Sequence, residues 1–237
     1  HTDLPASLPR QKEEEEPPKV RTYHISEIPL IPISELGWAN ADDDGGAASG
    51  SAYIFERQPD GSWAETKLTA SDGTAVDYFG KSVAISGTTV LVGANGDDDG
   101  GNESGSAYIF ERQPDGSWAE TKLTASDGAE SDDFGWSVSL SGSTALVGAK
   151  GDDDDGNDSG SAYIFERQPD GSWAETKLRA SDGAQDDSFG WSIALSGNIA
   201  LVGAIYDDAD GSAYLFDFGP QCYVQGERAG DCFCKEG

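Results

Sequence analysis

The sequence predicts an all-β protein made of about four similar antiparallel sheets. Three observations lead to this prediction: a long segment that recurs every 55 residues, runs of alternating apolar and polar residues, and short turns rich in Gly and Pro. The segment SGSAYIFERQPDGSWAETKL begins at Ser49, Ser104 and Ser159, and it returns in shortened form as GSAYLFD from Gly211. A fixed period of this size is typical of repeat architectures in which each unit completes the core of its neighbour.

One repeat contains four apolar runs. In the period that starts at Phe134, Trp136, Val138 and Leu140 alternate with serines, which is the periodicity of a β-strand. The first two runs are joined by Ser-Gly-Ser and the last two by Gln-Pro-Asp-Gly-Ser, turns that suit tight antiparallel hairpins. No segment shows the apolar stripe of an amphipathic helix. We therefore expect a β-propeller-like array of about four four-stranded antiparallel blades, with the first and last blades irregular.

A pair of short motifs recurs in these repeats. Phe-Gly stands at 79–80, 134–135 and 189–190, and each pair is followed some fourteen residues later by Gly-Ala at 93–94, 148–149 and 203–204. This pattern resembles FG-GAP repeats, the blades of the integrin α-subunit propeller and its microbial relatives, over roughly residues 24–218. The third motif residue differs, being Asn95, Lys150 or Ile205. The calcium loop DxDxDG that integrin-type blades often carry at the first turn is missing, so that site is not carried over.

The chain divides into three parts by composition. Residues 1–23 form a polar, Pro-rich arm with the bias of a disordered or polyproline segment, which we expect to lie against its own body or a neighbour's. Residues 24–218 hold the blades, at about 24–73, 74–128, 129–183 and 184–218. Residues 219–237 form a tail that contains all of the cysteines.

The two terminal blades depart from the pattern. In the first, the Pro-containing segment 28–33 takes the place of the innermost strand, where Pro removes hydrogen-bond donors from the ladder. In the last, the chain runs into Gly-Pro-Gln-Cys after Phe218, where the final hairpin should continue. The outermost strand of the fourth blade is therefore expected to be missing.

The charge of the chain is strongly negative. It has 44 acidic and 15 basic residues and a formal net charge of −29, which argues against nucleic acid and anionic membranes and favours cations or basic partners. No apolar run is long enough to span a bilayer, so we expect no membrane insertion. A chain that starts at His1 and lacks Met fits a processed, secreted product, and we expect an extracellular or cell-surface location.

More than half of the acidic residues are expected on one side of the blades. In an antiparallel meander, the loop after the second strand and the connector to the next blade lie at the same end. We expect Lys150 to be almost the only base among these acids. Hard oxygen ligands at this density suit Ca²⁺, and the alternative is that the acids only keep the protein soluble or adapt it to salt. The candidate calcium ligands are Asp42, Asp43, Asp44, Asp97, Asp98, Asp99, Asp152, Asp153, Asp154, Asp155, Asp207, Asp208 and Asp210.

Two further features point to a secreted protein. The sequons at Asn102 and Asn157 occupy equivalent places in two repeats and are candidate glycosylation sites. The three cysteines, Cys222, Cys232 and Cys234, are candidate disulfide formers, and their odd number suggests an intermolecular bond or a longer chain. The Cys-x-Cys-x-x-Gly ending faintly resembles an EGF-like module. A metal site at the cysteines is less favoured because no His lies nearby.

The sequence does not favour an enzyme. The two histidines, His1 and His24, lie outside the regular repeats, and the many carboxylates recur blade by blade, whereas an active site needs one asymmetric constellation. We expect a structural protein that polymerises with itself into a fibre or sheath. Its arm segment 19–26 would be donated as a strand to the last blade of the next molecule, or close the ring in the same chain. The alternative is a calcium-dependent adhesion or ligand-binding module with an extracellular protein or glycan as ligand.

Overall fold

The computed structural model describes residues 34–207, 210–219, 222–224 and 232–234. Within these ranges every regular element is a β-strand, and none is a helix that could cross a membrane. The strands are β1 (Ser34–Ala39), β2 (Ser51–Arg57), β3 (Trp63–Leu68), β4 (Ser82–Ser86), β5 (Thr89–Ala94), β6 (Ser106–Arg112), β7 (Trp118–Leu123), β8 (Phe134–Ser141), β9 (Thr144–Ala149), β10 (Ser161–Arg167), β11 (Trp173–Leu178), β12 (Phe189–Ser196), β13 (Ile199–Ala204), β14 (Ser212–Asp217), β15 (Cys222–Val224) and β16 (Cys232–Cys234).

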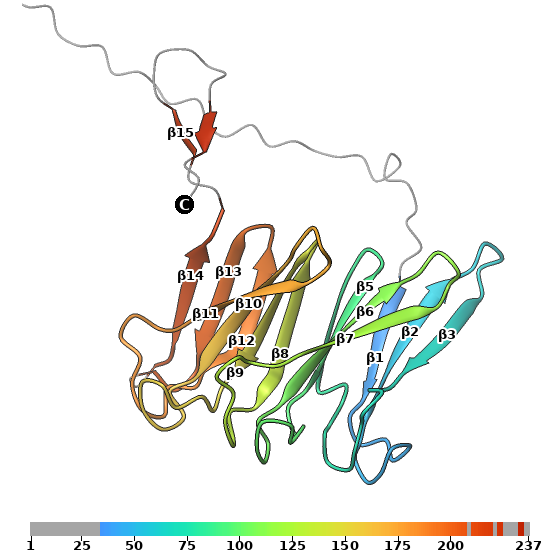
Figure 1. Cartoon of the computed structure of the whole chain (residues 1–237), viewed down its shortest axis with the longest axis horizontal. Coiled ribbons are helices and arrows are strands. Elements are labelled where there is room, and N and C mark those ends of the chain that lie inside the picture. Colours follow the sequence, from blue (N-terminus) through green and yellow to red (C-terminus); the bar gives the residue numbers. More distant parts are fainter. Residues whose placement is uncertain (1–33, 208–209, 220–221, 225–231, 235–237) are drawn as a thin grey trace, which may run out of the picture. The chain divides into compact units, whose positions relative to one another are not determined.

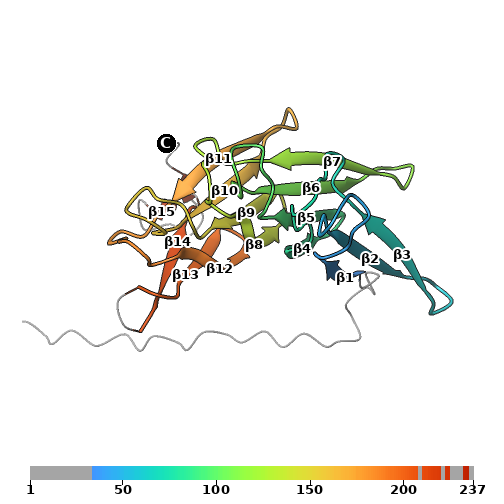
Figure 2. The same cartoon turned by 90° about the horizontal axis from the view of Figure 1, so that it is seen from below.

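These strands form antiparallel sheets in chain order, so each repeat is a meander (Figure 1). The sheets β4–β7 and β8–β11 have four strands each. The sheet β1–β3 has three described strands, and residues 28–33, which the sequence places at its inner side, lie outside the described part of the chain. The sheet β12–β14 (Figure 2) also has three strands within the described residues, with β14 at its edge, in agreement with the irregular last blade that the sequence predicts. The all-β, propeller-like prediction with irregular terminal blades is thus confirmed.

Apolar layers, which we call junctions, join each sheet to the next. In the second junction, Leu91 and Ile109 of the β4–β7 sheet pack against Phe134 and Val147 of the β8–β11 sheet. In the first junction, Ala52, Ile54 and Leu68 pack against Phe79, Val90 and Val92, and in the third, Leu146, Ala162 and Ile164 pack against Phe189, Ala200 and Val202. Equivalent positions of each repeat therefore meet the following sheet.

The Phe-Gly pairs connect consecutive repeats at these junctions. The backbone nitrogen of Phe134 donates a hydrogen bond to the carbonyl oxygen of Ser104 (3.0 Å), and Phe134 forms a parallel bridge with Gly105. Gly135 has a φ of +90°, and a Cβ there would lie 2.2 Å from the carbonyl oxygen of Ser106. Only glycine combines this backbone conformation with so close an approach.

The tail contains one small hairpin. Strands β15 and β16 pair antiparallel, with Cys222 opposite Cys234 in the register. Disulfide formation by the three cysteines stays a prediction. The arm of residues 1–23, the segment 19–26 that was expected to be donated, and the candidate ligand Asp208 all lie outside the described residues.

Candidate functional site

The acidic side of the sheets is built around cross-strand pairs of tyrosine and lysine. In the β6–β7 hairpin Tyr108 lies directly opposite Lys122, and in the β10–β11 hairpin Tyr163 lies opposite Lys177. Directly opposite residues project from the same face of a sheet. Each pair therefore places a hydroxyl and an ammonium group side by side, near the loop that follows the second strand.

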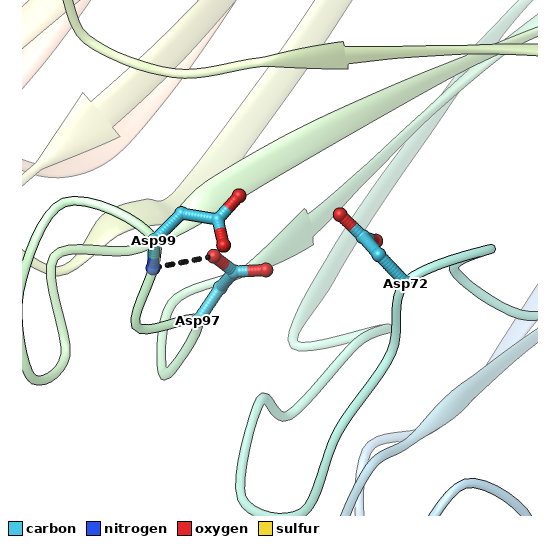
Figure 3. Close-up of side chains that lie close together, drawn as sticks. All are labelled: Asp72, Asp97 and Asp99. Atoms are coloured by element: carbon cyan, nitrogen blue, oxygen red, sulfur yellow. Dashed lines mark hydrogen bonds between the residues drawn. The ribbon is translucent and has the colours of Figure 1, made fainter.

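Three aspartates surround the first of these pairs, in a group that we call the Lys122 cluster. The Lys122 Nζ lies 2.8 Å from Asp72, 2.9 Å from Asp97 and 2.5 Å from Asp99. The Tyr108 hydroxyl donates to Asp72 or Asp97, each at 2.9 Å. Asp97 and Asp99 come from the loop after β5, where the Asp99 backbone nitrogen donates to Asp97 (3.1 Å), and Asp72 comes from the connector after β3 (Figure 3).

The next repeat builds the same arrangement, which we call the Lys177 cluster. The Lys177 Nζ lies 2.8 Å from both Asp127 and Asp152 and 2.7 Å from Asp154. The Tyr163 hydroxyl reaches Asp127 at 2.9 Å and Asp152 at 3.0 Å. Each cluster thus ties a connector to the loop of the following repeat.

Burial and charge fix the ionisation of these groups. Desolvation, followed by the charges of the neighbouring aspartates, raises the pKa of Tyr108 and Tyr163 far above the ordinary value, so both hydroxyls stay protonated and donate. Partial burial acts to raise the pKa of Asp72, but the hydrogen bonds from Lys122 and Tyr108 outweigh it, and the pKa is lowered. For Lys122, the aspartate contacts likewise outweigh desolvation, and its pKa is raised. Asp72 and Lys122 are therefore stabilised in their charged forms, and the two tyrosines act as neutral hydrogen-bond donors.

These lysines correct one expectation from the sequence. Lys150 is not almost the only base among the acids, because Lys67, Lys122 and Lys177 all reach into the acidic side. In the first repeat Lys67 contacts Asp42 at 3.0 Å and also pairs with Asp44. Strand register explains the difference. These lysines are distant in sequence from the acidic loops, but each lies opposite a tyrosine at the open end of its hairpin, which is the end next to the acidic loop.

The last repeat has a different version of the cluster. The Tyr214 hydroxyl reaches Asp182 at 2.8 Å and Asp207 at 2.6 Å, as its equivalents do in earlier repeats. The strand that would carry the lysine has no counterpart in the β12–β14 sheet. In the described part of the chain, this group of two carboxylates and a hydroxyl therefore has no lysine partner.

The two complete clusters are also the places where a metal ion could be held. The carboxylates of Asp72, Asp97 and Asp99 offer oxygens within 4.8 Å of one another, as do those of Asp127, Asp152 and Asp154. However, one lysine ammonium already contacts all three carboxylates in each group. A calcium ion would have to displace it, so the donor sets of these two clusters fit a lysine better than a resident metal.

The other predicted ligands have separate roles. Asp43, Asp98 and Asp153 each accept a hydrogen bond of 2.8 Å from a backbone nitrogen five residues later, which holds the loop closed. Asp155 lies 3.2 Å from Arg179, and Asp210 is exposed. The asparagines of both sequons, Asn102 and Asn157, are exposed on these same loops, and their glycosylation stays a prediction.

The tyrosines and lysines of the clusters are the functional residues that the sequence-based prediction missed. The signal was present: both recur with the repeat, and counting back from the Pro-Asp-Gly turn places Tyr108 opposite Lys122. The prediction considered only acidic residues as ligands and did not use the register of the hairpin. The connector residues Asp72, Asp127 and Asp182 were placed on the acidic side but not among the ligands.

Comparison with known proteins gives one family. A family model described as an FG-GAP repeat matches residues 63–110, 118–165 and 173–216, which together make up more than half of the chain. Each match starts at the outer strand of one sheet and ends in the third strand of the next, so it spans a junction. No curated protein matches the chain. The resemblance carried by the Phe-Gly and Gly-Ala motifs is thereby confirmed.

Proposed function

The chain belongs to the FG-GAP repeat family, and we propose that it is a secreted structural module that assembles head to tail with further copies of itself. FG-GAP repeats are typical of extracellular proteins. In the proposed assembly the β12–β14 sheet of one copy packs against the β1–β3 sheet of the next. No catalytic role is part of the proposal.

The observation that carries this proposal is the exposed face of the last sheet. Leu201 is 45% exposed and Leu215 is 67% exposed. Their equivalents one repeat earlier, Leu146 and Ile164, are 0% and 2% exposed because the next sheet covers them. A sheet face that is apolar, not covered by any described element and similar in pattern to the three internal junctions favours a partner of the same kind.

The first sheet offers the complementary half of a junction. In the internal junctions, tyrosine and phenylalanine of the following sheet lie in the packed layer, as Tyr163 and Phe165 do. Their equivalents in the first sheet, Tyr53 and Phe55, are only partly buried. Packing these rings on Leu215 would repeat the internal contacts across two molecules.

Charged residues near the Pro-Asp-Gly turns, at the end of the sheets away from the acidic side, support the same pairing. Glu111 pairs with Arg167 across the second junction at 3.0 Å, and Glu56 pairs with Arg112 across the first. Continuing this pattern beyond the last sheet brings Asp217, which occupies the place of Glu111, to the place where the next copy presents Arg57. Both side chains are exposed in the described structure.

The arm is proposed to strengthen this contact. In the described part of the chain β14 pairs only with β13, which leaves its other edge free for a strand. We propose that residues 19–26 of another copy fill this place, because the segment alternates and is rich in β-formers. The alternative is that the arm of the same chain fills it.

A charge-reversal experiment tests the face contact. Asp217→Arg and Arg57→Asp should each weaken assembly of the purified full chain, measured by sedimentation velocity and electron microscopy. Mixing the two variants should restore it, because the arginine of one variant then meets the aspartate of the other. Asp170→Arg, on an exposed turn, is the matched control. Mixed variants that stay as dispersed as each variant alone would contradict the proposed pairing.

Deletion of residues 1–26 tests the arm separately. The truncated chain should assemble less, and a peptide of residues 19–26 should restore assembly by adding a strand at the free edge of β14. Unchanged polymers from the truncated chain would refute donation of the arm while leaving the face contact in place.

One observation favours a second function, a calcium-dependent adhesion or ligand-binding module. The Asp182–Asp207–Tyr214 group has no described lysine, and calcium takes several oxygen ligands in flexible loops. If calcium binds there, it stabilises the folded chain by mass action. Millimolar calcium should then raise the Tm of the wild type but not that of Asp207→Asn, with Asp98→Asn as the control. Equal Tm values with calcium and with chelator, at fixed ionic strength, would contradict this function.

A further inference from the structure

A pocket beside the third junction has no part in the proposed assembly. Its volume is about 490 Å³, which lies within the usual range of small-ligand sites. It combines charged and aromatic side chains from two neighbouring repeats, and its lining residues are Lys150, Asp158, Asp186, Ser188, Trp191 and Tyr206.

Two aromatic rings form one wall of this pocket. Trp191, at the start of β12, and Tyr206, just after β13, lie edge to face with ring centroids 6.0 Å apart. Tyr206 is 60% exposed, although it is among the larger apolar side chains of the protein. Trp191 is held in place by Trp136 of the preceding repeat, whose ring centroid lies 5.0 Å away. The wall is therefore rigid at its base and open to solvent at Tyr206.

The preceding repeat shows what such a ring binds in this protein. The ammonium of Lys81 lies 3.9 Å from the ring centroid of Trp136, and that of Lys150 lies 4.3 Å from it. Both distances are well within the range of cation–π attraction. Trp191 is the equivalent of Trp136 one repeat later. The same kind of ring at the same place in the fold is thus known to take an ammonium group.

The last repeat replaces the groups equivalent to those that hold the cation close to Trp136, and the nearest ammonium to Trp191, that of Lys150, lies 5.8 Å from its ring centroid. Lys150, which pairs with Asp133, is replaced one repeat later by Ile205, and Asp133 is replaced by Ser188. Gly151 is replaced by Tyr206, which adds a second ring. The position of the internal lysine is therefore lost at the same place where a second aromatic surface is gained.

The charges at the pocket select for a cation. Asp158 and Asp186 contribute two carboxylates to its lining. The one lining base, Lys150, pairs with Asp133 and lies 4.3 Å from the ring centroid of Trp136, and its contact with Trp191 is longer, at 5.8 Å. We propose that this pocket binds an alkylammonium group between the rings of Trp191 and Tyr206 and the carboxylates of Asp158 and Asp186. The group can belong to a small quaternary amine or to a lysine side chain, and both share this chemistry.

Titration of the full chain with two probes, choline and N-acetyl-lysine amide, tests the proposal through tryptophan fluorescence and isothermal calorimetry. Tyr206→Ala and Asp186→Asn should each weaken binding about threefold, the loss expected for an exposed cation–π contact or ion pair. Trp63→Phe, which changes an exposed tryptophan far from the pocket in sequence, should bind as the wild type does. Added salt should weaken binding because it screens the carboxylates.

The two probes also distinguish the two possible origins of the bound ammonium group. Binding of choline alone assigns the pocket to free quaternary amines, and binding of the lysine amide alone assigns it to a lysine side chain of a partner. Saturable binding of a neutral sugar such as glucose with no response to either amine would overturn the proposal. Equal affinity in the wild type, Tyr206→Ala and Asp186→Asn would overturn it as well, since any binding would then lie elsewhere.

Discussion

The β8–β11 and β12–β14 sheets carry nearly the same sequence in their shared strands, yet among the described residues only the first is covered on both faces. Leu146 and Ile164 are buried against the following sheet, whereas Leu201 and Leu215 occupy the same positions and are exposed. The difference does not come from the strands themselves, because both leucines keep the register of their equivalents. A blade of this family is therefore completed by its neighbour, and the last sheet is half of a junction.

The acidic side shows the same contrast. The Lys177 cluster holds three carboxylates around one ammonium, whereas the Asp182–Asp207–Tyr214 group has no lysine partner among the described residues, where the β12–β14 sheet has no fourth strand. In the described part of the chain, the end of this sheet at β14 thus leaves both an open edge and a group of acids with no lysine partner. Substitutions at equivalent positions of the two repeats measure what each part of a junction contributes.

Replacing a glycine at a junction should give the largest difference in stability loss between equivalent positions of two repeats. A Cβ at Gly160 would lie 2.1 Å from the carbonyl oxygen of Phe189, whereas at Gly211, which forms no bridge to a Phe-Gly pair among the described residues, the nearest atom is 2.9 Å away. Both residues have positive φ. Gly160→Ala should therefore cost more than about 3 kcal/mol and Gly211→Ala about 1 kcal/mol, measured by urea unfolding. Similar losses would mean that the backbone contact contributes little to the junction.

Leucine truncation compares a covered face with an open one. Leu146→Ala should destabilise the protein by about 3 kcal/mol because it leaves a cavity in the third junction. Leu201→Ala, measured in dilute solution, should cost less than about 1 kcal/mol because water already contacts that side chain. Equal free-energy losses at the two positions would contradict an open face on the last sheet.

Lysine removal compares a complete cluster with a partial one. Lys177→Ala leaves the buried Asp152 without its counter-charge and should cost about 2 kcal/mol. Lys67→Ala should cost less, since Asp42 and Asp44 are more exposed and water can solvate them. The measurement is chemical unfolding at neutral pH. A larger loss for Lys67→Ala would show that the clusters do not depend on burial.

One connector acid should give an effect that is visible only in the pH dependence of stability. Burial raises the pKa of Asp132 to about 6 from 3.8, so the folded chain keeps this proton where the unfolded chain loses it. This contribution to stability is complete below pH 3.8 and is lost as the pH rises through about 6. It amounts to at most about 1.4 kcal/mol per pH unit.

The variant Asp132→Asn removes that contribution. The unfolding free energy of the wild type minus that of the variant is measured at constant ionic strength. This difference should fall as the pH rises from 4 to 6 and stay level above about pH 7. The hydrogen bond that the Ala129 backbone nitrogen donates to Asp132 at 2.7 Å can be kept by the asparagine oxygen. A difference that rises with pH would mean that the pKa of Asp132 is lowered in the folded chain.

Much of this architecture could be predicted from the sequence because the same local patterns occur in each repeat. Alternation within each run, the Pro-Asp-Gly turns and the early end after Phe218 predict the strands, the hairpins and the missing strand. The Phe-Gly motif also predicts the family. These features are local in the chain, so one repeat is enough to read them.

The contacts between strands and repeats were harder to predict. The Lys122 cluster joins residues up to 50 positions apart, and its centre is a lysine that a search for metal ligands does not consider. The pairing of Trp136 with Lys81 and Lys150 depends on how consecutive sheets pack, which periodicity does not determine. The arm lies outside the described residues, and its predicted role rests on the sequence alone.

Sedimentation equilibrium of the full chain over a range of concentrations tests the open-face account most directly. The wild type should associate as the concentration rises, because packing of Leu201 and Leu215 against a second copy removes apolar surface from water. Leu215→Lys should stay monomeric and fold normally, since the side chain is exposed, whereas Val76→Lys, at an exposed position in a connector, should associate as the wild type does. A wild type that remains monomeric at all concentrations, or a Leu215→Lys variant that associates equally well, would contradict the account.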